Sequence, residues 1–153
     1  MIKLLLIAVS FFYCLPTFAQ QYINMNRAEV KHALLYFSHD RKFNTITAET
    51  DSTLSFLIRD TTTQNFDMLV QFDSSGKCDM ELKLLNCDRC YKLSLNSVLS
   101  NKKYLWTKID STHYVSVFSK HLTLTILPNT PFAFVIQRIN ISRKEYRSRY
   151  RKI

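Results

Sequence analysis

Two cysteines three positions apart give the sharpest chemical signal in the sequence. Cys87-Asp-Arg-Cys90 lies between an alternating apolar stretch and a segment with helical spacing. Two thiols at the start of a helix can form a redox-active disulfide, because the helix end and Arg89 would stabilise a thiolate. Cys78 adds a third thiol upstream, and the sequence alone does not choose a pairing.

Three roles fit these cysteines. We favour a structural role, in which the cysteines form a disulfide or remain as buried free thiols. A labile redox pair formed by Cys87 and Cys90 is the second role. A thioredoxin-like pair would also need a parallel sheet, whereas the flanking pattern is a meander and Trp-Cys-Gly-Pro is absent. A metal site would need a second pair of ligands, which no spacing in the chain provides. We therefore predict no metal and no cofactor.

The other side chains whose types could support catalysis are dispersed along the sequence. His32 and His39 are seven residues apart, which places them about 10 Å apart along a helix, too far to share one metal ion. His113 and His121 are expected at a strand start and a turn. The chain contains one glycine, no Gly-x-Ser-x-Gly and no His-Glu-x-x-His. These observations predict a protein that is not an enzyme.

The C-terminal residues 143–153 carry six basic side chains and one acidic one, whereas residues 20–142 carry 14 basic and 11 acidic. Two tyrosines lie four positions apart among them. Basic residues with interleaved aromatics can bind nucleic acid or an anionic membrane surface. For an exported chain we expect an envelope protein, an anionic glycan or a membrane surface instead of nucleic acid. The candidate contact residues are Arg143, Lys144, Tyr146, Arg147, Arg149, Tyr150, Arg151 and Lys152.

Residues 1–19 have the layout of a secretory signal peptide. Lys3 is followed by an apolar run to Leu15, and Thr17-Phe18-Ala19 ends in a small residue. The run is shorter than the roughly 20 residues that span a bilayer. We therefore predict cleavage after Ala19, no membrane span in the mature chain, and export to the periplasm, the outer envelope or the medium.

Residues 20–142 are expected to form a single α+β domain, with residues 143–153 as a basic tail. The central feature is a hairpin over Asn65–Leu85, whose turn Asp73-Ser-Ser-Gly-Lys77 contains the one glycine. Strict alternation predicts one apolar face, because side chains of a strand point to opposite sides in turn. That face should hold Phe66, Met68, Val70, Phe72, Cys78, Met80, Leu82 and Leu84. The outer face should hold Asp67, Leu69, Gln71, Asp73, Asp79, Glu81 and Lys83.

Helices are expected on either side of this hairpin region. Asn26 and Glu29 have the spacing of a capping box and start a helix over 26–38 with Val30, Ala33, Leu34 and Phe37 on one face. A second helix follows Asn86 or Asp88, with Tyr91, Leu95, Val98 and Leu99 as its buried stripe. Further strands are predicted over 45–49, 54–58, 104–109, 114–118, 122–127 and 132–139. The predicted order is helix, three strands, helix, three or four strands, forming antiparallel meanders covered by two helices.

This layout resembles a broad set of small exported bacterial α+β proteins without an assigned activity. The resemblance depends on the helix over 26–38, on the turn Phe72-Asp-Ser-Ser-Gly-Lys-Cys78, and on the stretch Tyr104–Ile109 with its Trp106. It implies no catalytic residues. The sequence therefore predicts a non-enzymatic exported binding module with a basic tail. A thiol–disulfide redox protein and a subunit of an envelope assembly are the alternatives.

Overall fold

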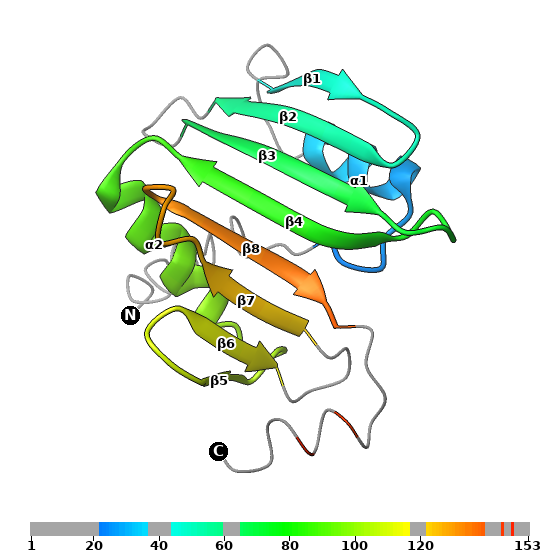
Figure 1. The fold of residues 1–153 in the computed structure, drawn as a ribbon. Coiled ribbons are helices and arrows are strands. Elements are labelled where there is room, and N and C mark those ends of the chain that lie inside the picture. Colours follow the sequence, from blue (N-terminus) through cyan, green and yellow to red (C-terminus); the bar gives the residue numbers. More distant parts are fainter. Residues whose placement is uncertain are drawn as a thin grey trace, which may run out of the picture.

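The fold is one antiparallel sheet of eight strands with two helices (Figure 1). The structure, a computed structural model, describes residues 22–36, 44–59, 65–116, 122–139, 145 and 148. The strands are β1 (Asn44–Glu49), β2 (Thr53–Arg59), β3 (Asn65–Phe72), β4 (Cys78–Leu85), β5 (Trp106–Lys108), β6 (His113–Ser116), β7 (Leu122–Ile126) and β8 (Ala133–Arg138). The helices are α1 (Arg27–Tyr36) and α2 (Asp88–Leu99). The α+β class and the antiparallel sheet predicted from the sequence are confirmed.

The chain is built from two similar halves, each a helix followed by four strands. The strand order across the sheet is β1-β2-β3-β4-β8-β7-β6-β5, so the last strand of each half meets the other at the centre. The prediction of three strands after the first helix was wrong by one strand. The short strand predicted over 45–49 is present as β1, with the polar sequence NTITAE. Together with the strand over 54–58 and the two arms of the hairpin, it gives four strands.

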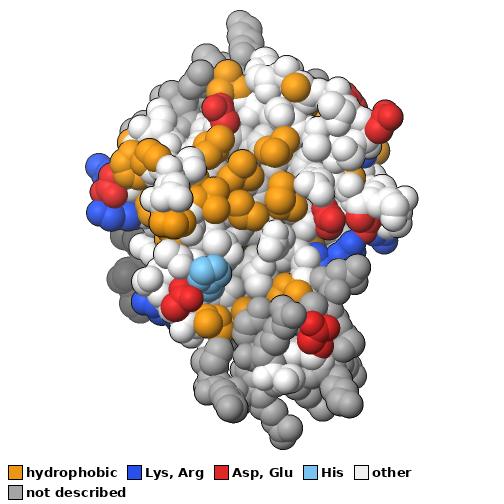
Figure 2. Space-filling model, viewed as in Figure 1, with side chains coloured by type: hydrophobic (Ala, Val, Ile, Leu, Met, Phe, Trp, Pro, Cys, Tyr) orange, Lys and Arg blue, Asp and Glu red, His pale blue; other side chains and the backbone are white. Residues whose placement is uncertain are grey.

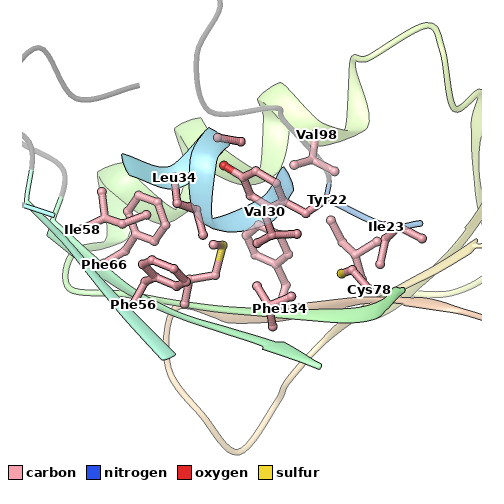
Figure 3. Packing of buried hydrophobic residues seen from close by; sticks show 14 of the residues in the cluster. Tyr22, Ile23, Val30, Leu34, Phe56, Ile58, Phe66, Cys78, Val98 and Phe134 are labelled. Atoms are coloured by element: carbon pink, nitrogen blue, oxygen red, sulfur yellow. The ribbon is translucent and has the colours of Figure 1, made fainter. Parts of the chain in front are cut away.

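Both helices lie on the same side of the sheet, and the core fills the space between them and the strands (Figures 1 and 3). The predicted capping box is present: the backbone N–H of Glu29 donates to Asn26 Oδ1 at 2.9 Å, and the backbone N–H of Asn26 donates to Glu29 Oε2 at 2.7 Å. Val30, Ala33 and Leu34 of α1 are buried as expected. Phe37 lies outside the described residues.

The second helix begins one residue away from either predicted cap. Cys87 is its N-cap, and its sulfur accepts the backbone N–H of Cys90 at 3.0 Å. Leu95 and Val98 are buried, as the spacing predicted, together with Cys90 and Ser94. Within the described parts of the chain, no helix has the length and apolar character needed to cross a membrane.

The central hairpin has the predicted turn and the predicted first arm. Gly76 has φ 74°, a left-handed conformation that glycine adopts without strain. Asp73 Oδ1 accepts the backbone N–H groups of Ser75 and Lys77 at 2.9 and 3.1 Å, closing the turn. Phe66, Met68, Val70 and Phe72 of β3 all face the helices and are buried.

The second arm of the hairpin contradicts the alternation prediction. Cys78 pairs with Phe72, but Met80 already pairs with Gln71, so the register shifts at Asp79. This is a β-bulge, in which one extra residue reverses which side chains face the core. Glu81 and Lys83 are consequently buried beneath the helices, at 0% and 3% exposure. Met80, Leu82 and Leu84 turn to the opposite face.

The strand predicted over 104–109 is present only over Trp106–Lys108. Leu105 has a positive φ of 44°, which an extended strand does not allow, so β5 begins only at Trp106. Tyr104 is buried before this kink, and its carbonyl oxygen accepts a hydrogen bond from the Ser116 hydroxyl. The kink therefore anchors the outer edge of the second half to β6.

Candidate functional site

The face of the sheet opposite the two helices, which we call the open face, carries a continuous group of apolar side chains. Cross-strand partners share a face, so the strand register defines the group. Leu69 pairs with Leu82, and Leu82 pairs in turn with Val135. In the adjacent row Asp67 lies between Leu57 and Leu84. We call the following residues the apolar patch: Leu57, Leu69, Met80, Leu82, Leu84 and Val135.

These six side chains are all half-buried. Figure 2 views this face and shows hydrophobic side chains gathered over its centre. An apolar side chain that stays in contact with water forgoes about 25 cal/mol for each Å² left unburied. A contiguous exposed apolar group framed by polar residues marks an interaction surface in folded proteins.

Two amide side chains border the patch, and one carboxylate lies within it. Gln71 and Gln137, both exposed, flank Met80 on the neighbouring strands. Asp67 is exposed and lies between Leu57 and Leu84. The surface is therefore mostly apolar, with amides at one end and a single carboxylate between two leucines. These side chains lie on four adjacent strands and do not converge on a point, so the surface suits a broad partner.

The sequence did not reveal this patch, because the alternation assigned Met80, Leu82 and Leu84 to the core. The residue types near Asp79 do not predict a β-bulge. One signal was present: leucines also occupy the outer positions 57 and 69 of the neighbouring strands, where a solvated face would place polar residues. Both faces of the central sheet are therefore apolar in sequence, a pattern that a strand covered on both sides also shows.

Beneath the helices, the buried carboxylate of Glu81 holds the first described residues of the chain. Its Oε1 accepts the backbone N–H groups of Tyr22 and Ile23, the latter at 3.0 Å. Both residues are buried, at 7% and 4% exposure. The same segment is joined to β4 by hydrogen bonds from Asn24 N–H to the Cys78 carbonyl and from Cys78 N–H to the Met25 carbonyl, each 2.8 Å. Glu81 therefore fixes an N-terminal strap, residues 22–26, against the sheet.

The surroundings of Glu81 alter its ionisation and that of its neighbours. Burial raises the pKa of Glu81 to about 7, although Lys83 and the strap N–H groups oppose the shift. Burial lowers the pKa of Lys83, which the charge of Glu81 opposes. Perturbed pairs of this kind occur at catalytic sites. Here both side chains are closed off from solvent, so the pair is better explained as an anchor for the strap.

Cys78, Cys87 and Cys90 form one disulfide and one free thiol. Cys87 and Cys90 are bonded to each other, while Cys78 is a free buried thiol on β4. Burial, followed by the charge of Glu81, raises the pKa of Cys78. The pairing that the sequence left open is thus within the Cys87–Cys90 turn, and Cys78 belongs to the core.

The other predicted site residues are not brought together. His32 and His113 are both exposed, and His113 Nδ1 lies 2.9 Å from Asp110. Asp73 binds Arg138, and its hydrogen bonds lower its pKa. Among the described residues no three His, Cys, Asp or Glu side chains are grouped as a metal site requires. His39, His121, residues 1–21 and all eight candidate contact residues of the tail lie outside the described residues.

No family model, no curated protein and no solved structure matches this chain.

Proposed function

We propose that this chain is an exported interaction protein that binds another protein through the open face of its sheet. The apolar patch around Leu82 is the observation that carries the proposal. It lies at the centre of the sheet, where β4 and β8, the last strands of the two halves, pair with each other. A partner would cover the patch as the helices cover the other side.

Charge supports a partner other than a second copy. Asp67 lies within the patch, between Leu57 and Leu84, and a second copy docked by the same face would bring another carboxylate. A partner with a basic side chain opposite Asp67 would gain an ion pair. An exposed pair of this kind mainly affects the association rate and its salt dependence.

The basic tail supports a second, weaker contact with an anionic membrane surface or glycan. Its six basic side chains give it a strong local positive charge. Contact of this kind is screened by salt, over about 8 Å at physiological ionic strength. Deletion of residues 143–153 should abolish low-salt binding to vesicles containing anionic lipid. Unchanged binding would remove the tail from the proposal.

The open face is tested by a charge placed at its centre. Leu82→Glu should lower affinity for the partner captured by the wild-type chain at least about tenfold, equivalent to 1.4 kcal/mol. The matched control is Leu93→Glu, the same substitution at a position of α2 that is 51% exposed. Equal capture by the two variants, with both folded, would contradict the proposal.

A further inference from the structure

The Cys87–Cys90 disulfide lies where a thiol of another molecule can reach only one of its two sulfurs. Cys87 is half-buried at the exposed corner between β4 and α2, whereas Cys90 is 3% exposed. Thiol–disulfide exchange proceeds by attack of a thiolate on one sulfur while the other leaves. The burial pattern therefore makes Cys87 the attacked sulfur and Cys90 the leaving group.

The same corner would stabilise Cys87 once the bond is broken. Its sulfur already accepts the backbone N–H of Cys90 at 3.0 Å, at the N-terminal end of a 12-residue helix. A thiolate in this position gains from the hydrogen bond and from the positive end of the helix. The nearby carboxylate of Asp88 would oppose this, but it is paired with Lys92 at 2.7 Å. Arg89 adds an exposed positive charge beside it.

The fold does not depend on this bond. It closes a loop with a sequence separation of 3, and disulfides that close short loops restrict the unfolded chain least. The start of α2 is held independently by Tyr91, whose ring lies 6.1 Å from that of Phe132 and 6.2 Å from that of Phe134. The helix should therefore remain docked when the disulfide is reduced.

We propose that Cys87 and Cys90 form a thiol–disulfide exchange site that oxidises dithiols of other proteins. A substrate thiolate attacks Cys87 Sγ and forms a mixed disulfide. The Cys87–Cys90 bond breaks, and its electron pair leaves on Cys90 Sγ, which takes up a proton. The second substrate thiolate then attacks the substrate sulfur of the mixed disulfide and releases Cys87. Two electrons pass to the pair, and the substrate leaves as a disulfide.

Cys78 does not take part. It is fully buried, and its sulfur contacts the carbonyl oxygen of Met80 on its own strand at 3.7 Å. A Cys78→Ala variant is therefore the natural background for experiments, because it removes the third thiol and leaves the exchanging pair intact.

The test is a redox titration of the full mature chain in glutathione buffers, with the thiols counted by alkylation and mass spectrometry. We expect the native disulfide to be half-reduced within the range that glutathione buffers cover, while the circular dichroism spectrum stays folded. A disulfide that resists excess reduced glutathione until the chain is denatured would overturn the proposal.

A second measurement uses Cys90→Ser in the Cys78→Ala background, followed by the pH dependence of Cys87 alkylation. The midpoint should lie at least about one unit below the 8.5 of free cysteine. In the reciprocal variant, Cys87→Ser, Cys90 should react only after denaturation. A Cys87 midpoint at or above that of free cysteine would contradict the role of the helix end. Should Cys90→Ser not fold, alkylation of the reduced Cys78→Ala chain, resolved by peptide, gives the same midpoint.

Discussion

Glu81 and Lys83 show that an ionisable side chain can be buried where it makes a specific contact. Both side chains are buried two positions apart on β4, where desolvation opposes the charged form of each. A buried pair contributes little net stability, because desolvation offsets the mutual attraction. What Glu81 supplies is an acceptor for two backbone N–H groups of the strap that would otherwise be buried without one.

Removal of one member of the pair and neutralisation of both members should change the free energy of unfolding differently. Glu81→Ala should lower the free energy of unfolding by about 2–5 kcal/mol, because it leaves two buried N–H groups of the strap without their acceptor, at about 1–3 kcal/mol each. Glu81→Gln combined with Lys83→Met keeps an acceptor and removes both charges. This double variant should be at least as stable as the wild type in urea titrations. Equal destabilisation by both changes would show that the charges themselves are needed.

Glu81 also predicts a pH dependence of stability. Its pKa is about 7 when folded, against an ordinary value of 4.5, so between these values the folded chain holds a proton that the unfolded chain has lost. The free energy of unfolding should therefore fall as pH rises through this window, by about 3 kcal/mol in total. Asp73 and Asp110, whose pKa values are lowered, act with the opposite sign and at lower pH.

Urea titrations at several pH values between 4.5 and 8 test this slope. The Glu81→Gln, Lys83→Met variant is the control, since it should lose the slope over the same interval. A wild-type free energy of unfolding that is flat or rises there would show that Glu81 is ionised throughout.

At the scale of elements, the central hairpin separates what alternation predicts from what it does not. The turn and β3 follow from local sequence: Asp73, Ser75 and Gly76 have the residue types that tight turns require. The β-bulge at Asp79 does not follow from local sequence, because it depends on how β4 pairs with β3 and β8 across the sheet. One extra residue exchanges the two faces of a strand, so the core residue Glu81 and the surface residue Leu82 were both assigned wrongly.

The turn itself makes a prediction. Gly76 has φ 74°, and an added Cβ would have no neighbour within 4 Å. Gly76→Ala should therefore cost about 1–2 kcal/mol from backbone conformation alone. Ser74→Ala, at an exposed position of the same turn, should change the free energy of unfolding by less than about 0.5 kcal/mol. Chemical denaturation measures both, and an unchanged Gly76→Ala variant would mean that the turn adopts another conformation.

At the scale of the whole molecule, the two helices cover one face of the sheet, and no other helix or strand of the described residues covers the opposite face. Helical spacing predicted two helices, and strand alternation with short loops predicted an antiparallel sheet; both are present. They did not predict that α1 and α2 would lie on the same side (Figure 3), because the capping box and the buried stripe specify a helix without specifying which face it covers. The open face follows from that arrangement together with the bulge.

Site-specific photo-crosslinking in the producing cell tests most directly whether the apolar patch binds another protein. A photoreactive amino acid at position 82 would lie in the apolar patch, and one at position 92 on exposed α2 is the matched control. We predict one dominant adduct with a different protein from position 82, and none from position 92. Its yield should fall when Leu69→Glu is added. No adduct at position 82, an equal adduct at position 92, or an adduct with a second copy of the chain would contradict the account.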